Sequence, residues 1–173
     1  SCDLLDLTPK AAVTVKTYFK NESELELYAN RFYSDILPGG SGIYKEIGDN
    51  MIWIPLASEV SLTRTVPEKG GGWSFEALRH INFLLENISN CPDAVAVRKY
   101  TGVAKFFRAH YYFNMVKRFG DVPWLDHVPG TDDPALYKAR DSRDFVMEKV
   151  IEDLDEAIRL FKKENSTKDL YHV

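Results

Sequence analysis

Apolar side chains recur every three or four positions in four stretches of the chain, which is the spacing of one face of an α-helix. The longest stretch starts at Pro92 and ends at Phe119, and Gly120 and Pro123 follow it, a pattern typical of a helix C-terminus. Its apolar stripe consists of Val97, Tyr100, Ala104, Phe107, Tyr111 and Met115, widened by Phe106, Phe113 and Val116. We therefore predict a central helix that its neighbours cover on most sides.

Three further helices are predicted from the same spacing. The first follows Asn21, a capping residue with Glu24 three positions later, and ends near residue 37, before Pro38. The second covers residues 74–88, and the fourth begins after Asp141 or Ser142. The predicted inner faces are Leu25, Tyr28, Ala29, Phe32, Tyr33 and Ile36 in the first, Phe75, Leu78, Ile81, Leu85 and Ile88 in the second, and Phe145, Val146, Val150, Leu154, Ile158 and Phe161 in the fourth. The sequence predicts an all-α fold.

A long irregular loop region, residues 38–72, is predicted between the first and second helices. It holds most of the chain's ten glycines. Irregular segments longer than about 12–15 residues inside compact domains are usually binding loops or disordered segments. The region is therefore a candidate for a functional binding loop.

The polar residues on the predicted helices are expected to serve structure. Asn82 lies among apolar neighbours, and a buried amide needs hydrogen-bond partners, so we expect it to bond a backbone group rather than a ligand. Acidic residues on the fourth helix alternate with Lys149 and Arg159, which is typical of a solvated face. They are Glu148, Glu152, Asp153, Asp155 and Glu156.

Composition excludes several function classes. The chain has 173 residues, of which 45% are hydrophobic, enough for one domain with its own core. Its net charge of −4 disfavours a nucleic-acid partner. Its apolar runs fall far short of the roughly 20 residues that cross a bilayer.

Its histidines are scattered and no serine-nucleophile motif occurs, so we expect no enzyme, metal or cofactor. Cys91, before Pro92, is expected to be a half-buried thiol.

The segment at residues 102–123 resembles the signature of the SusD/RagB-like family of Bacteroidetes outer-membrane lipoproteins. It contains Arg-Ala at 108–109, Tyr-Tyr-Phe at 111–113 and Arg-Phe-Gly-Asp-Val-Pro at 118–123. Three more matches lie in the family's order: Cys2 followed by Leu-Asp-Leu-Thr-Pro at 5–9, Ile-Asn-Phe-Leu-Leu-Glu-Asn-Ile at 81–88, and Val-Ile-Glu-Asp-Leu-Asp-Glu-Ala-Ile at 150–158. Four ordered matches make the resemblance specific.

The resemblance implies an organisation for the chain. It implies that residues 1–20 form an N-terminal tether and that Cys2 carries a lipid anchor. The alternative for Cys2 is an ordinary terminal cysteine. Residues 21–163 become a helical domain, in which the third and fourth helices form an antiparallel, tetratricopeptide-like pair. Residues 164–173 are a tail that departs from the family. We expect either an N-terminal piece of a longer protein or an unusual short relative.

The resemblance also implies a function. Such a protein sits on the cell surface, attached to the outer membrane by its lipid anchor only, captures a glycan or another nutrient, and delivers it to a SusC-like TonB-dependent transporter. The ligand-binding candidates are Trp53 and Trp73, which lie outside the helix stripes, with Asp49, Asn50 and Arg64 nearby in the sequence. Two alternatives stay open: Trp73 packs at a helix start, or the chain contacts the transporter without binding sugar.

Overall fold

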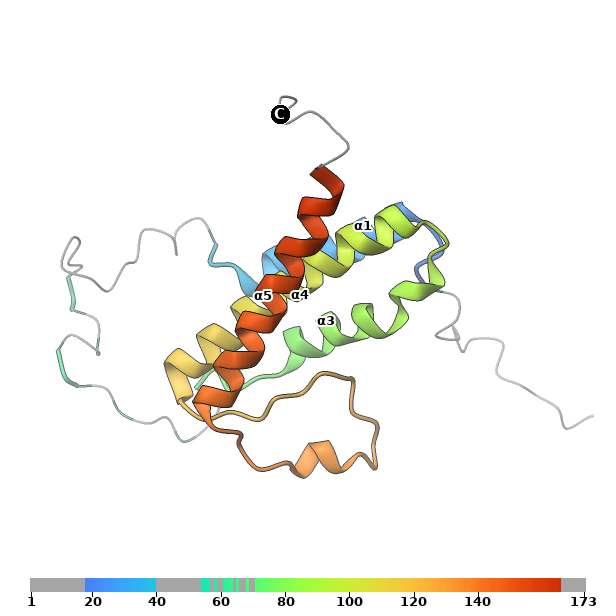
Figure 1. The fold of residues 1–173 in the computed structure, drawn as a ribbon. Helices are drawn as coiled ribbons and strands as arrows, with labels where there is room; N and C mark the ends of the chain where they lie inside the picture. Colours follow the sequence, from blue (N-terminus) through green and yellow to red (C-terminus); the bar gives the residue numbers. More distant parts are fainter. Residues whose placement is uncertain are drawn as a thin grey trace, which may run out of the picture.

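The computed structural model describes residues 18–39, 54–56, 58, 61–63, 65, 68 and 71–165. Four α-helices form the described part, as Figure 1 shows: α1 (Glu22–Ile36), α3 (Glu76–Asn87), α4 (Ala94–Phe119) and α5 (Arg143–Asn165). Two short 3-10 helices accompany them, η2 (Ile88–Asn90) and η3 (Pro134–Tyr137). The all-α prediction is confirmed. Most of the loop region at 38–72 lies outside the described residues, and the tetratricopeptide-like character of the helix pairs stays a prediction.

Local hydrogen bonds explain where the helices begin and end. The Asn21 side chain accepts from the Glu24 backbone N–H at 3.0 Å, and the Glu24 carboxylate accepts from the Lys20 backbone N–H at 2.9 Å. Asp93 caps α4 by accepting from two backbone N–H groups of its first turn, so α4 begins two residues later than the predicted start at Pro92. Gly120 then ends α4 with a positive φ of 72° that favours glycine.

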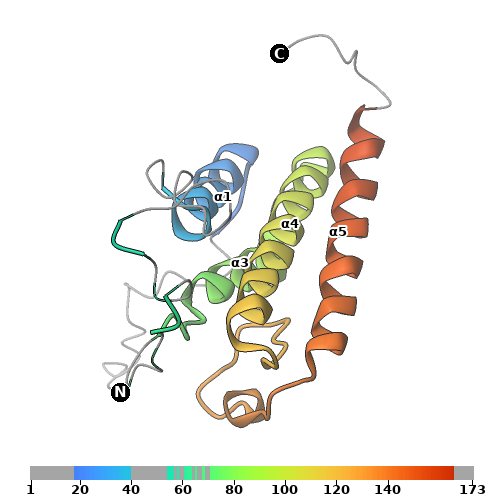
Figure 2. The ribbon, with the colours of Figure 1, turned by 90° about the vertical axis from the view of Figure 1, so that its left-hand side faces the viewer.

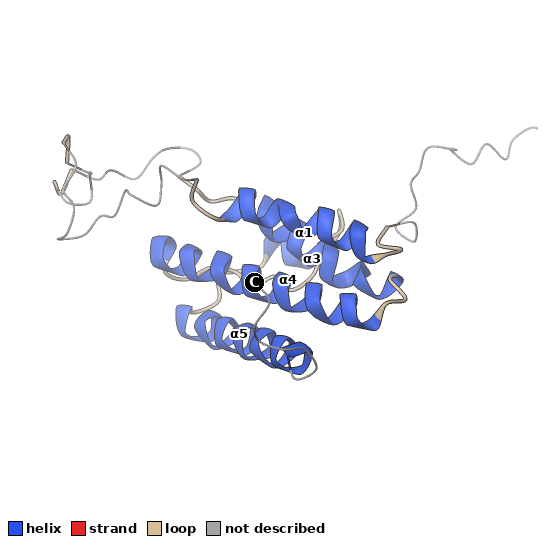
Figure 3. Ribbon diagram, turned by 90° about the horizontal axis from the view of Figure 1, so that it is seen from above, coloured by secondary structure: helices blue, strands red, loops and turns tan. Residues whose placement is uncertain are grey.

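α4 is the central helix. Figure 3, seen from above, shows α1 and α3 on one side of α4 and α5 on the other. Figure 2 shows α5 lying alongside α4 in the antiparallel direction, as the sequence predicted for this pair. Gly102 permits the close approach of these two helices, because a Cβ atom there would lie only 3.0 Å from the ring of Phe161.

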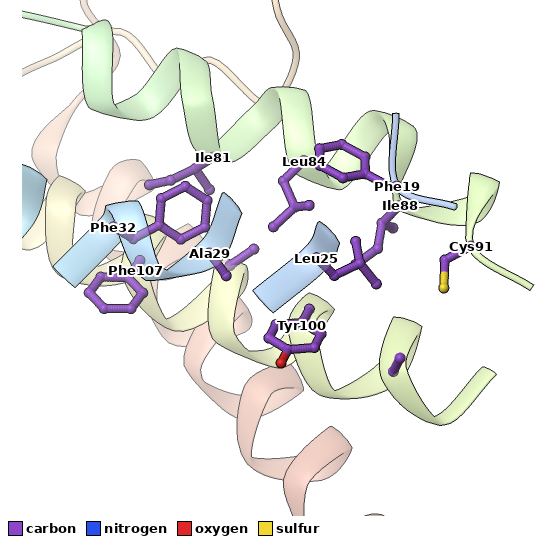
Figure 4. Close-up of a cluster of buried hydrophobic side chains, with 12 residues drawn as sticks. Phe19, Leu25, Ala29, Phe32, Ile81, Leu84, Ile88, Cys91, Tyr100 and Phe107 are labelled. Carbon is purple, nitrogen blue, oxygen red and sulfur yellow. The ribbon is translucent and has the colours of Figure 1, made fainter. Parts of the chain in front are cut away.

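The buried side chains form two clusters along α4. The first lies between α1, α3 and the N-terminal half of α4 (Figure 4) and includes Phe32, Ile81, Leu84 and Phe107. It also takes in Cys91, which is only 4% exposed and so more buried than predicted. The second cluster lies between the C-terminal half of α4, the start of α3, the segment after α4, and α5. Its members are Leu78, Ala109, Tyr111, Tyr112, Met115, Val122, Trp124, Val146 and Val150.

Several predicted core positions are wrong. Phe106 and Phe113 on α4 are 42% and 43% exposed, and Phe145 and Ile158 on α5 are exposed as well. On α3, Leu84 is fully buried, and Leu85 only partly. Most of the predicted stripe on α4 is buried, and the buried face extends further to Arg108, Ala109 and Tyr112. The buried charge of Arg108 is compensated by Asp153 of α5.

Candidate ligand-binding site

A surface cavity of about 490 Å³ lies between the N-terminal half of α3 and the loop that joins α4 to α5. Its volume falls in the usual range for small-molecule sites. The α3 side supplies Trp73, Phe75, Glu76, Leu78, Arg79 and Asn82, and the loop supplies Pro123, Leu125, His127, Pro129, Ala135, Leu136 and Lys138. Apolar walls with a few polar groups are typical of a binding site.

Trp73 is the predicted ligand residue that the structure places in this cavity. Its side chain is 37% exposed, and the Arg140 guanidinium lies 4.7 Å from the centre of its ring. Phe75 and Phe119 meet it edge-on, with ring centres 5.4 and 4.9 Å away. Trp73 therefore both packs at the start of α3 and shows part of its ring to the cavity. The other predicted residues, Asp49, Asn50, Trp53 and Arg64, lie outside the described residues.

The loop wall of the cavity is closed at its base. Val122 and Asp141 form an antiparallel bridge, with the Asp141 N–H donating to the Val122 carbonyl at 3.2 Å. The Asp141 carboxylate accepts from the Trp124 backbone N–H at 2.7 Å and pairs with Lys138 at 2.7 Å. Asp121 accepts from the Arg143 backbone N–H at 2.9 Å. The two ends of the loop are thus tied together before α5 begins.

Side chains from α3 and α4 hold the middle of the loop. The Tyr112 hydroxyl accepts from the Leu125 N–H at 2.7 Å and donates to the Pro123 carbonyl at 3.1 Å. Asn82 donates to the carbonyls of Leu125 and His127 at 3.0 and 3.1 Å. Burial of the Tyr112 hydroxyl raises the pKa of Tyr112 far above its ordinary value, so this hydroxyl stays neutral. The prediction that Asn82 bonds backbone groups is confirmed.

A buried ion network connects Asn82 to α4 and α5. Arg108 donates two hydrogen bonds to Asp153, at 2.6 and 2.8 Å, and a third to the Asn82 side-chain oxygen at 3.3 Å. Lys105 also donates to Asp153, at 2.9 Å. The prediction that Asp153 belongs to a solvated acidic face is wrong, because Asp153 is only 3% exposed. Together these residues link α5 through α4 to the cavity wall.

His127 braces the outer part of the loop. Its Nδ1 lies 3.0 Å from Asp126 Oδ1 and its Nε2 lies 2.8 Å from Asp133 Oδ2. These hydrogen bonds, first with Asp126 and then with Asp133, raise the pKa of His127 above its ordinary value. Asp133 in turn caps η3 by accepting from the Ala135 N–H at 2.8 Å. The loop therefore presents a defined surface to the cavity.

The loop side of the cavity was not predicted from the sequence. Leu125, His127, Pro129 and Lys138 carry no helical periodicity, and they lie between the third and fourth predicted helices, where the sequence alone predicts no ligand site. The prolines of this segment, and Asp121 and Asp141 at its ends, were a signal of an ordered loop, since such residues stabilise ordered turns.

Other kinds of site find no support in the residues that the structure describes. These residues contain no group of three or more His, Cys, Asp or Glu side chains arranged to hold a metal ion. None of the described helices combines the length and the apolar character that a membrane crossing requires.

The described part of the chain is helical, and a cavity of small-molecule size lies between α3 and the loop that joins α4 to α5. Residues 62–172 match the SusD-like_2 family model, described as starch-binding associating with outer membrane. The match covers more than half of the chain, and the chain belongs to this family, as the sequence motifs predicted. The family's description names binding and outer-membrane association. No match was found among curated proteins or among solved structures.

Proposed function

We propose that this chain is a cell-surface glycan-binding lipoprotein that hands its ligand to a SusC-like TonB-dependent transporter in the outer membrane. The observation that carries the proposal is the cavity beside α3, in which partly exposed aromatic rings lie next to hydrogen-bonding side chains. Sugars bind to sites of this kind, in which aromatic side chains cover the ring and a few polar groups fix its orientation. The family's description as starch-binding agrees with this chemistry.

The roles of the lining residues follow from the bonds they already make. Asn82 uses its amide on the loop and on Arg108, so it shapes the wall rather than contacting ligand. Trp73 and Phe75 supply the apolar surface, and Glu76 and Arg79 supply exposed charged groups beside it. The sugar ring would lie against Trp73, with its hydroxyls toward the polar side chains of α3.

Replacing Trp73 with Ala is expected to weaken glycan binding at least tenfold, because a buried aromatic contact commonly contributes more than about 1 kcal/mol to a binding site. Isothermal titration with a glycan that the unchanged chain binds measures the effect. Phe113→Ala is the matched control, since Phe113 has similar exposure (43%) but does not line the cavity. Equal affinity of the W73A variant and the unchanged chain would exclude Trp73 from the site.

Further ligand contacts are proposed for Trp53, Asp49, Asn50 and Arg64. These residues lie outside the described part of the chain, and the sequence is their only support. Trp53→Ala in the same titration tests whether their segment contributes to binding.

The anchor is proposed at Cys2, with residues 1–20 as its tether and residues 21–163 as the binding domain. Cys2→Ala in the precursor that carries the signal peptide is expected to move the protein from the membrane fraction to the soluble fraction, because the acyl chains on this cysteine would supply the attachment. Fractionation with a radiolabelled fatty acid measures both position and lipid. Membrane retention of C2A without label would contradict the anchor.

A second candidate function is protein binding without sugar, favoured by apolar side chains exposed on α4 and α5. Phe106 and Phe113 lie seven residues apart on one side of α4, and Ile151 and Ile158, 55% and 49% exposed, are spaced alike on α5. If these exposed side chains mediate self-association, sedimentation velocity will show assembly as the concentration rises, and Phe113→Asp will abolish that assembly. A monomer at all concentrations, together with glycan binding, would favour the first proposal.

A further inference from the structure

The loop wall of the cavity has two parts. The first part is fixed on α3, because Asn82 donates to the His127 carbonyl at 3.1 Å and Glu86 accepts from the Val128 N–H at 2.6 Å. The second part is η3, the short orange helix in Figure 1, which brings Leu136 to the cavity. The shape of the cavity therefore depends on how these two parts are joined.

The His127 side chain joins the two parts. Its Nε2 lies 2.8 Å from an oxygen of Asp133, the residue that caps η3, and its Nδ1 lies 3.0 Å from an oxygen of Asp126. Ionised carboxylates only accept hydrogen bonds, whereas a neutral imidazole has one N–H group and one bare nitrogen. Only the imidazolium can therefore donate to both carboxylates at once. A neutral ring divides its single N–H between them and holds η3 for part of the time.

We propose that His127 is a positioning residue for the cavity, which fixes η3 to the α3 side of the loop when its ring is protonated and releases η3 when the ring is neutral. The inference rests on the proposed glycan-binding function and adds its regulation by pH. The η3 wall keeps its place while the ring is charged, so the affinity for glycan falls as the pH rises.

The charges around His127 favour its protonated form. The charged groups on the elements around this ring are Asp126, Asp133, Lys138 and Asp141 in the loop, Glu76, Arg79 and Glu86 on α3, and Arg108 on α4. Lys138 and Arg108 are already paired with other carboxylates. The hydrogen bonds of the ring, first with Asp126 and then with Asp133, therefore dominate and raise the pKa of His127.

The direction of the pH effect follows from this shift. A group whose pKa is raised in the ordered structure stabilises that structure fully below its ordinary pKa, and the contribution is lost as the pH rises through the raised value. For His127 this loss occurs above the ordinary pKa of 6.5. Burial lowers the pKa values of His80 and His110, so those rings lose their protons at lower pH. Hydrogen bonds lower the pKa values of Asp126, from His127, and of Asp133, from the η3 backbone, so both carboxylates stay ionised in this range.

Isothermal titration of the full chain with maltoheptaose, a linear starch oligosaccharide, at about pH 6 and at about pH 9 tests the effect on binding. We expect the affinity to fall about threefold over this range, the size of effect that an exposed ion pair gives. His127→Gln keeps a hydrogen-bonding side chain that cannot be protonated, and it is expected to bind equally at both pH values. His110→Gln is the matched control, because His110 lies on α4 outside the cavity lining, and it keeps the pH dependence.

An NMR titration follows the same contact without any sugar. We expect the His127 ring to titrate with a midpoint above 6.5, and the amide signals of Ala135 and Leu136 in η3 to shift with the same midpoint. Asp133→Asn retains an oxygen that can cap η3 but removes the charge, so it should lower the midpoint of the His127 titration.

Three results would overturn the proposal: a His127 midpoint at or below 6.5, η3 amide signals that do not follow the ring, or maltoheptaose binding whose pH dependence is absent or is retained by H127Q. Absence of maltoheptaose binding at every pH would instead count against the proposed glycan-binding function. The NMR titration then still decides whether His127 positions η3.

Discussion

Replacing Asp153 with Ala is expected to lower the free energy of unfolding by about 3–5 kcal/mol, the usual cost of leaving one partner of a buried ion pair alone. Arg108 is 5% exposed and directs two hydrogen bonds at this carboxylate, so its charge would stay buried without a counterion. Urea denaturation followed by circular dichroism measures the change. Because Arg108 also bonds Asn82, the same variant is expected to weaken ligand binding at the cavity.

Asp155→Ala is the control for this prediction, since Asp155 lies on the same helix and is exposed. Its effect should stay within about 0.5 kcal/mol, as for most surface substitutions. The double variant Arg108→Met with Asp153→Leu should recover much of the stability, because apolar residues of similar volume can replace a buried pair. A D153A variant as stable as D155A would show that the pair contributes nothing to the fold.

Replacing Phe107 with Ala is expected to cost about 3–5 kcal/mol as well, for a different reason. The Phe107 side chain is 1% exposed and lies between α1 and α4 in the first cluster (Figure 4), so its removal leaves a cavity that the helices cannot close. Its ring meets those of Phe32 at 5.7 Å and Tyr33 at 4.8 Å. Chemical denaturation again measures the loss.

Phe106→Ala provides the matched control for F107A. It removes the same side chain from the neighbouring position, where the ring is 42% exposed, and should cost about 1 kcal/mol or less. If F107A lost less than about 1 kcal/mol, the α4 stripe would not face the core, and the assignment of α4 as the central helix would fail.

The sequence by itself determined the helices and most of their ends. The capping residue Asn21 and the terminating Gly120 act on backbone groups within a few positions, so the local order of residues predicts their effect. The start of α4 was predicted two residues too early, at Pro92, where Asp93 is the capping residue. The apolar periodicity likewise identified Phe107 and Tyr111 as core residues, because one helix face is defined by spacing alone. Four motifs in the family's order, at residues 2–9, 81–88, 102–123 and 150–158, predicted the family that the family model confirms.

Only the tertiary structure decided which of several apolar or charged faces is covered. Asp153 and Arg108 are 45 residues apart, and nothing local distinguishes Asp153 from the exposed acids beside it until α5 packs on α4. Phe106 fits the apolar pattern as well as Phe107, yet it faces away from the helices that bury its neighbour.

The cavity depends on the same long-range contacts, because its two walls come from segments that Asn82 and Tyr112 join through hydrogen bonds to the loop backbone. Periodicity describes one element at a time, and a site made between elements exists only after they have packed.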